Sequence, residues 1–437
     1  MNDALQRGVL QANAVWPNGT SVAGSIGFGS IFSFDLVAPQ VVQQYQQLGN
    51  PTWLALPLYQ HAAYTANASL LRSVVLPYLR GCVNVYLAYA VLNASDGLLH
   101  LPPTASPEYP YPPPGRPGWD THYDLALFQW GLRTLLGIAQ ALNISSAEEP
   151  LVSVWRAALA RLAPLPVNEH GYMVDAAHGF DTPHRHFSHL FAIYPLHLTA
   201  WAPEDGGSDA SRALMLASLD RWNGLTCSGG ASGRDCPNGF TFDGSASMSA
   251  LVPGRAAAAA GNISAFATSG LMHASTLYSE GRQPCMESPV AAAASLQEML
   301  LQSWGGRVRV FPGAPWPQAL FHQLGAEGGF AVSAARGDAP GGGVSWVGVE
   351  AVQYCAGEAG AGGSRPIVLV AEGLGPAASV ATVPSGVAVS DAPGGALAFD
   401  VPVGATVLLY QRGGPAPDFV VQALAGNASQ FHYWGKH

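Results

Sequence analysis

Three histidines and one arginine lie within six residues, at His184, Arg185, His186 and His189. Neutral imidazoles and a guanidinium offer hydrogen-bonding groups in fixed directions, which suits a ligand with many hydroxyl groups. The spacing does not match a zinc motif, because His-x-Glu-x-x-His is absent and no carboxylate or cysteine completes the set. The sequence therefore predicts no metal and no cofactor. The alternative is a solvated polar turn that caps a helix starting near Phe187.

Glu108 lies in a long proline-rich segment that runs from Leu101 to Trp119. Long ordered connections in compact domains are usually functional. A carboxylic acid in a partly apolar pocket has a raised pKa and can protonate a glycosidic oxygen near neutral pH. Tyr109, Tyr111 and Trp119 are candidates to line that pocket, which makes Glu108 a candidate general acid. The alternative is a loop carboxylate that faces water.

Two further carboxylates stand at predicted helix starts. Asp124 follows Asp120 by one helical turn, and Glu287 comes just before an apolar helix. A carboxylate is favoured there by the helix dipole, so a purely structural role is the alternative for both.

The composition describes a chain with a large apolar core and few charges. Of its 437 residues 49% are hydrophobic and 11% are charged, and the net charge is −9. This length leaves room for two or three domains. The low positive charge predicts no nucleic-acid partner and no anionic membrane surface as a partner. No uninterrupted apolar stretch reaches membrane-spanning length, so we expect no membrane insertion.

Several features are typical of the secretory pathway. The five cysteines contain no Cys-x-x-Cys, and Cys227 and Cys236 flank a short loop that a local disulfide can close. The first residues, Met1 to Ala4, do not resemble a signal peptide, so we expect the true N-terminus to be missing. Six Asn-x-Ser/Thr sequons occur, at Asn18, Asn67, Asn93, Asn143, Asn262 and Asn427.

The candidate residues need a scaffold, and the first 304 residues predict a helical one. Apolar residues recur there at intervals of three to four, hairpin signals are scarce, and Pro77 predicts a break in one helix. This pattern predicts an all-α domain of antiparallel helix pairs. Helices are expected near residues 51–62, 68–92, 120–142, 147–162, 208–222, 245–260, 264–279 and 289–304.

The sequence pattern changes at Gly305-Gly306, after which short β-prone runs are separated by glycine and proline. We therefore predict a helical catalytic-type domain over residues 1–304 and a C-terminal β-sandwich over residues 305–437. The expected strands are near residues 307–312, 328–334, 344–349, 366–372, 387–389, 397–401 and 405–410.

The run His-Arg-His-x-Ser-His-Leu at residues 184–190, followed by Tyr194-Pro195, resembles the signature of glycoside hydrolase family 95. Its known members are inverting α-L-fucosidases and related α-L-galactosidases. The resemblance covers about residues 45–410. It implies a mainly α chain: an (α/α)6 toroid, whose first helices are expected to be missing here, followed by a small C-terminal β-sandwich. It also implies that no cofactor or metal is needed.

The resemblance assigns roles to individual residues. The Ser-Pro-Glu segment after Asp96-Gly97-Leu98-Leu99 looks like the family segment with the general acid, so this role falls to Glu108. Trp53 and His61 stand in Trp-Leu-x-x-x-Leu-Tyr-x-His, which is similar to a family helix that contacts substrate; core packing is the alternative for Trp53. Asp124 resembles a family aspartate that orients the acid loop or binds sugar.

The base side departs from the family. Glu287 matches an aspartate that polarises the base machinery, and its extra methylene can move that geometry by about an ångström, which can cost on the order of 100-fold in rate. The family's base is an asparagine pair in an Asn-x-Asn segment upstream of the acid, and this chain has no such segment.

The first hypothesis is an α-L-fucosidase-like hydrolase of the secretory pathway that cleaves oligosaccharides or glycoconjugates. Glu108 is its general acid, Glu287 lies on its base side, and the remaining candidates bind substrate: Trp53, His61, Trp119, Asp124, His184, Arg185, His186 and His189. The second hypothesis is a degenerate family member that binds glycans without cleaving them, for example in an extracellular matrix. The absent asparagine pair and the glutamate at position 287 favour the second. A truncated form of an active enzyme is a third possibility.

Overall fold

The computed structural model describes residues 48–109, 111, 117–184, 186–228, 251–268, 278–280, 283–285, 287–337, 343–354, 363–414 and 416–417. The chain divides into two compact units. The first consists of Met1–Ala62, Asn67–Thr199 and Ala210–Leu225, and the second of Ala63–Ala66, Ala200–Asp209 and Thr226–His437. The predicted domain boundary between residues 304 and 305 stays a prediction.

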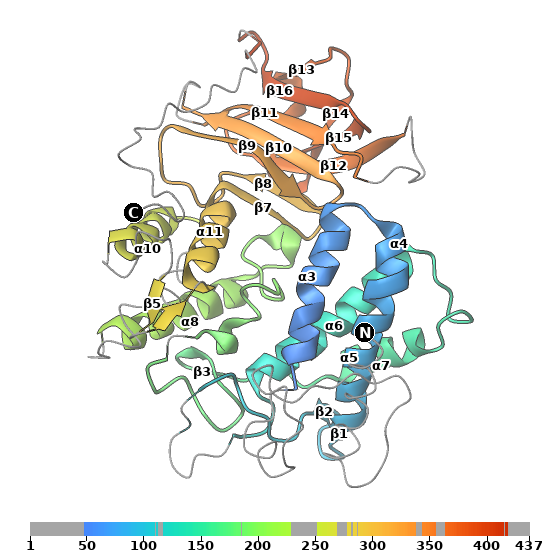
Figure 1. The fold of residues 1–437 in the computed structure, drawn as a ribbon, viewed down its shortest axis with the longest axis vertical. Coiled ribbons are helices and arrows are strands. Elements are labelled where there is room, and N and C mark those ends of the chain that lie inside the picture. Colours follow the sequence, from blue (N-terminus) through green and yellow to red (C-terminus); the bar gives the residue numbers. More distant parts are fainter. Residues whose placement is uncertain are drawn as a thin grey trace. The chain divides into compact units, whose positions relative to one another are not determined.

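Helices pack around one long buried helix in the first unit. This helix, α6, has a run from His122 to Phe128 that is buried at every position, and it contacts both α5 and α7 (Figure 1). Several of its buried side chains are large and apolar, and each of these contributes about 1.5–3 kcal/mol when fully buried. The helices of this part are α3 (Asn50–Tyr64), α4 (Ala68–Leu70), α5 (Leu76–Tyr89), α6 (His122–Ala141), α7 (Leu151–Arg161) and α8 (Asp209–Ser228).

Two short hairpins interrupt the helices, and they frame the loops that carry the candidate residues. β1 (Val91–Leu92) pairs with β2 (Leu99–His100), just before the proline-rich segment. β3 (Val167–Asn168) pairs with β4 (Gly171–Tyr172), just before the loop that leads to the histidine run. The proline-rich segment and the histidine run therefore both enter the unit from anchored ends.

The kink or break expected at Pro77 takes the form of a change of winding within a continuous helical segment. Leu71–Val75 forms a π-helical turn, and Pro77 stands in the first turn of the α-helix that follows. Proline has no backbone N–H and its ring crowds the preceding turn, so a change of helical winding just before it is the expected response.

Three helix expectations are wrong. The helix predicted to start near Phe187 is only a 3-10 turn, Ser188–Leu190. The helix predicted for residues 264–279 does not extend to its predicted end, because Tyr278–Glu280 is strand β5, paired with β6 (Gln283–Cys285), although residues 264–268 belong to α10 (Ala256–Thr268). The helix predicted for residues 289–304 ends with α11 (Glu287–Leu300), because the next four residues pair with a strand instead.

Two five-stranded sheets lie in the described part of the second unit. The first has the order β13-β16-β11-β10-β9 and the second β14-β15-β12-β8-β7; β8 and β12 are parallel and the other pairs antiparallel. Both sheets contribute to one core, with Val347 and Val349 from the first and Leu369 and Val401 from the second. The strands are β7 (Leu301–Trp304), β8 (Arg307–Val310), β9 (Ala319–Ala326), β10 (Phe330–Arg336), β11 (Val344–Ala351), β12 (Ser364–Ala371), β13 (Val380–Val383), β14 (Val389–Ala392), β15 (Ala396–Pro402) and β16 (Thr406–Gln411).

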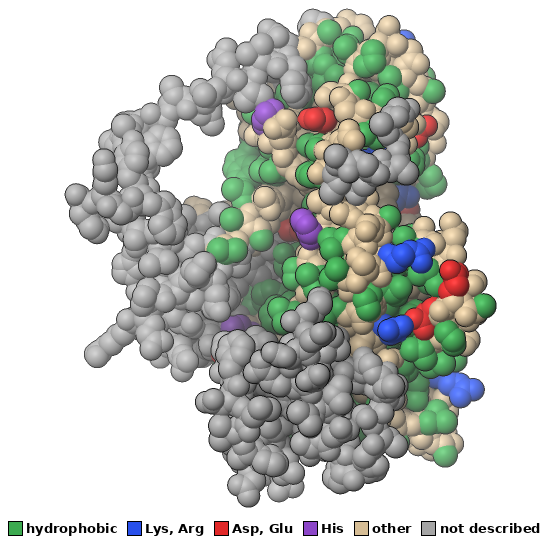
Figure 2. All heavy atoms as spheres, turned by 45° about the vertical axis from the view of Figure 1, so that its right-hand side comes forward, with side chains coloured by type: hydrophobic (Ala, Val, Ile, Leu, Met, Phe, Trp, Pro, Cys, Tyr) green, Lys and Arg blue, Asp and Glu red, His purple; other side chains and the backbone are tan. Residues whose placement is uncertain are grey.

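The surface carries few charges, as the composition requires. On the face drawn in Figure 2, acidic and basic side chains are interspersed among hydrophobic and uncharged ones, and neither sign forms a large patch. Among the described helices, none combines the length and the apolar character needed to cross a bilayer.

Candidate active site

Glu108 and His186 form the pair around which the candidate site is built. His186 Nε2 lies 3.1 Å from Glu108 Oε2, although the two residues are 78 positions apart in the chain. The Glu108 side chain is 42% exposed and that of His186 is 27% exposed, so the pair is accessible to a ligand. At this distance the two groups can form a hydrogen bond in which the imidazole is donor or acceptor according to its tautomer. The pair thus offers a proton donor with a neighbour that stabilises the carboxylate left behind.

The backbone at Glu108 is held in an uncommon conformation. Its φ of 54° lies in the left-handed region, which costs a residue with a Cβ about 1–2 kcal/mol. The preceding residues are anchored on both sides: the Ser106 N–H donates to the Tyr111 hydroxyl at 2.9 Å, and the Ser106 hydroxyl is 2.7 Å from that of Ser188. These bonds keep the turn closed and present the Glu108 side chain to His186.

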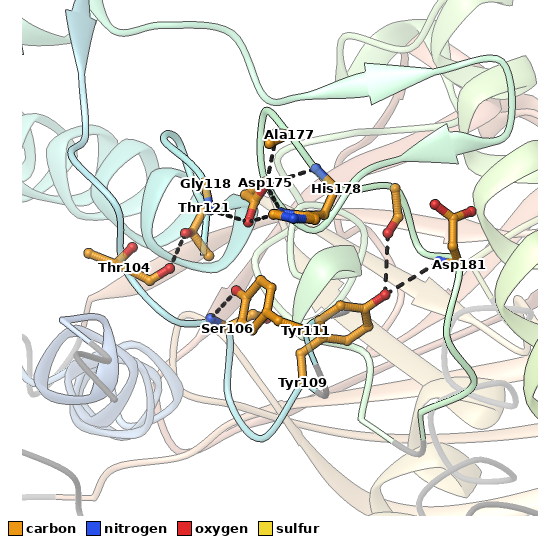
Figure 3. Close-up of polar contacts among 11 residues, drawn as sticks. Thr104, Ser106, Tyr109, Tyr111, Gly118, Thr121, Asp175, Ala177, His178 and Asp181 are labelled. Carbon is orange, nitrogen blue, oxygen red and sulfur yellow. Dashed lines mark hydrogen bonds and ion pairs between the residues drawn. The ribbon is translucent and has the colours of Figure 1, made fainter. Parts of the chain in front are cut away.

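The hydroxyl of Tyr109 ties the Glu108 turn to the segment before the histidine run. It donates to the Gly179 carbonyl at 3.3 Å and accepts from the N–H groups of Asp181 at 3.4 Å and Thr182 at 3.3 Å (Figure 3). The tyrosine ring is buried and packs edge-on against His184. Sequence reasoning treated Tyr109 and Tyr111 as apolar walls, whereas their hydroxyls turn out to be the anchoring groups.

Asp175 is the second anchor, and the sequence analysis missed it. The carboxylate is fully buried and accepts from the N–H groups of Gly118, Ala177 and His178, and also from the His178 ring (Figure 3). The His178 ring in turn packs edge-on against Tyr111. Asp175 therefore joins the end of the proline-rich segment to the loop after β4. The Asp-x-x-His-Gly spacing was its only sequence signal.

Asp124 is buried at the start of α6. Burial raises its pKa from 3.8 to about 7, while nearby groups of Thr104, Tyr86 and Gly49 limit the rise. The Tyr86 hydroxyl donates to Asp124 Oδ1 at 3.2 Å. Thr104 belongs to the proline-rich segment and its carbonyl accepts from the Thr121 hydroxyl. Of the two roles expected for Asp124, its position supports orientation of the acid loop.

His184 and His189 differ from His186 in their surroundings. His184 is buried, and its Nε2 donates to the Pro107 carbonyl at 3.3 Å, next to Glu108. His189 is also buried, and its ring stacks on Phe180 with centroids 4.1 Å apart. Burial, with His122 and His184 nearby, lowers the pKa of His189 well below its usual value. These buried positions suit bracing of the pocket.

The remaining predicted residues are more dispersed. Trp53 is 39% exposed and contacts Phe191 edge-on, and His61 lies on the exposed side of α3. Trp119 is 46% exposed. Glu287 begins α11 in the second unit, and its side chain lies outside the described residues, as do Arg185 and the proposed pairing of Cys227 with Cys236.

The site combines a carboxyl group, imidazoles and hydroxyls. In the part of the chain that the structure describes, no group of three or more histidine, cysteine or acidic residues is arranged to hold a metal ion. The converging groups are instead a carboxyl, an accessible imidazole, buried hydroxyls and aromatic rings. Such a set can bind hydroxyl groups and deliver a proton to a leaving oxygen.

Comparison with known proteins agrees with this chemistry. Residues 30–226 match the family model of the glycosyl hydrolase family 95 catalytic domain. Over 152 residues, 33% of this chain, the sequence is 28% identical to alpha-L-fucosidase 2 of Arabidopsis thaliana, and the match covers 18% of that protein. A solved structure described as a kojibiose phosphorylase from the human microbiome superposes over 94% of this chain and 52% of its own length. The TM-score of that superposition is 0.52 at 10% identity, which shows a likeness of fold alone.

Proposed function

We propose that the chain acts on terminal α-L-fucosyl or L-galactosyl residues of glycans, because residues 30–226 match the family model of the glycosyl hydrolase family 95 catalytic domain. The reaction is a single displacement with inversion. Glu108 protonates the leaving glycosidic oxygen while a water attacks the opposite face of the sugar. The substrate is a neutral oligosaccharide or an oligosaccharide attached to a glycoconjugate.

The observation that carries the proposal is the contact of 3.1 Å between Glu108 and His186. A general acid must hold a proton before the step and must be stabilised as an anion after it. An imidazole at hydrogen-bond distance can do both through its two tautomers, since Nε2 without a proton accepts from the carboxyl O–H and Nε2–H donates to the carboxylate. The proton that reaches the leaving oxygen is the one on the carboxyl. Placement at an accessible turn leaves room for a sugar beside the pair.

The other predicted residues take supporting roles in this proposal. His184, Arg185 and His189 shape or bind within the pocket, Asp124 orients the acid loop, and Trp53, His61 and Trp119 contact sugar. Glu287 stays a prediction for the base side. In fold terms, we propose that the helices of the first unit are part of an (α/α)6 toroid. A secretory-pathway location is proposed from the sequons alone. A loss of mass on treatment with an endoglycosidase, measured on the protein from secreting cells, would support it.

The test is hydrolysis of a fucosylated oligosaccharide by the purified chain, beside Glu108→Gln. The variant should lower kcat by about 10²–10⁴-fold, the usual contribution of general acid catalysis. The kcat for an aryl α-L-fucoside should fall less, because its leaving group needs less protonation. Glu169→Gln is the matched control, since Glu169 is a carboxylate of the same unit with an 80% exposed side chain. Proton NMR of the first product formed reports inversion.

One outcome would overturn this proposal in favour of the second candidate. The chain lacks the family's Asn-x-Asn segment and has glutamate at position 287, which favours binding without cleavage. If a folded chain binds the oligosaccharide but releases no fucose, this chain is a glycan-binding protein. If Glu108→Gln retains full activity on the oligosaccharide, the acid is another residue.

A further inference from the structure

A second feature of the first unit lies beside the β1–β2 hairpin. There the structure has a pocket of about 450 Å³. This volume is within the range of small-molecule sites. Its lining consists of Val91, Leu92, Asn93, Ala94, His100 and Trp119.

The walls of this pocket expose large apolar side chains. Val91 is 45% exposed, Leu92 52% and Trp119 46%. An isolated exposed apolar residue needs no explanation, but three that line one concave site indicate a ligand. The amphipathic indole ring suits a ligand with both apolar C–H and polar O–H surfaces, since it offers a flat apolar face and one N–H donor.

The floor of the pocket has a defined charge. His100 Nδ1 lies 2.6 Å from Asp120 Oδ2, and His100 Nε2 lies 3.0 Å from Asp96 Oδ2. Both carboxylates raise the pKa of His100, with Asp120 as the larger cause. Two carboxylates beside one imidazole disfavour anionic ligands. The partly exposed Asp96 carboxylate has spare acceptor capacity for hydroxyl groups.

Trp119 is positioned by the same loops that hold the Glu108 turn. Its carbonyl accepts from the Ala176 N–H, and the neighbouring Gly118 N–H donates to Asp175 (Figure 3). His178, bound to Asp175, packs on Tyr111, whose hydroxyl accepts from Ser106. One continuous set of contacts therefore connects the platform residue to the turn that presents the acid.

We infer that the Trp119 pocket binds an uncharged sugar ring of the glycan, one that lies beyond the terminal ring to be cleaved. That the ring belongs to the same glycan rests on the proposed function, whereas binding of a neutral sugar in the pocket does not. The indole face of Trp119 stacks on the C–H face of the sugar, Val91 and Leu92 cover its edge, and Asp96 accepts from its hydroxyl groups.

Calorimetric titration of the full chain carrying Glu108→Gln tests this inference without turnover. The probes are lactose, 2′-fucosyllactose and 3′-sialyllactose. Lactose and 2′-fucosyllactose should bind, and the sialylated sugar should bind more weakly because of its charge. Adding Trp119→Ala should weaken lactose binding by about tenfold or more, as expected for loss of a buried aromatic contact. Leu92→Asp, at a surface position that tolerates charge, should do the same.

Trp316→Ala is the matched control, since Trp316 is 37% exposed in the second unit. The inference is overturned if lactose affinity is equal in Trp119→Ala, Leu92→Asp and Trp316→Ala. It is also overturned if the parent chain does not bind lactose. The active chain separates this result from the proposed function. Trp119→Ala should raise KM for 2′-fucosyllactose more than for an aryl fucoside, which has no second sugar. If lactose binding depends on Trp119 but the active chain hydrolyses no substrate, the inference about the pocket is supported and the proposed function is contradicted.

Discussion

Replacing Asp124 by asparagine should change how the stability of the protein depends on pH. In the folded chain burial raises the pKa of Asp124 from 3.8 to about 7. The folded state therefore binds this proton more tightly than the unfolded state does. As the pH rises from about 4 to 7, unfolded chains lose the proton while folded chains keep it, so the free energy of unfolding falls over this window.

The magnitude follows from the size of the shift. A difference of about 3 pKa units at 1.36 kcal/mol per unit corresponds to about 4 kcal/mol. This stabilisation is fully present below the unfolded-state pKa and is lost once the pH exceeds the folded-state value. Asparagine has nearly the same shape and does not titrate. Between about pH 4 and pH 8, the free energy of unfolding of the variant should therefore rise relative to that of the wild type by up to about 4 kcal/mol.

Urea unfolding, followed by tryptophan fluorescence at several pH values in this range, measures the difference. Burial also raises the pKa values of Glu298 and Glu327 to about 7, but both residues are present in the wild type and the variant, so their contributions cancel. Glu169→Gln controls for removal of a carboxylate at an exposed site. A difference between Asp124→Asn and wild type that does not vary with pH would refute the reasoning.

Two further predictions concern the loops around the Glu108 turn. Tyr109→Phe removes a hydroxyl with three backbone partners, so thermal unfolding should show a loss of about 1–3 kcal/mol and kcat on an oligosaccharide should fall. The exposed Tyr354→Phe is its control, and equal behaviour of both variants would contradict the anchoring role. Gly118→Ala places a Cβ 2.5 Å from Asp175 Oδ1, which should cost about 1–3 kcal/mol by overpacking. Gly137→Ala, with no neighbour within 4 Å of the new Cβ, should leave the helix at least as stable, and comparable melting temperatures would argue against a tight Gly118–Asp175 contact.

Much of the fold could be predicted from the sequence because periodicity reports burial. The apolar rhythm of α6 and the alternation in Arg307–Val310 both correspond to elements of the predicted type. Prediction failed where pairing with a distant segment decides the structure. Leu301–Trp304 continues the apolar rhythm of a helix, but it is a strand because β8 is available to pair with it.

The candidate site shows the same division. Local residue types and a family resemblance were sufficient to select Glu108 and the histidine run, and the match of residues 30–226 confirms the family resemblance. Neither indicated which histidine faces the carboxyl. His184, His186 and His189 have the same chemistry in sequence, yet one contacts Glu108, one braces Pro107 and one stacks on Phe180.

The sequence by itself determined the residue types of the site, the helical and β-rich parts of the chain and the absence of strong charge. These properties follow from composition and short-range periodicity, which any local segment carries. Tertiary structure alone decided the Glu108–His186 pair, the anchors Tyr109 and Asp175, and the Trp119 pocket. Each of these joins segments far apart in the chain, and hydrogen-bond distance and burial between such segments exist only once the chain has folded.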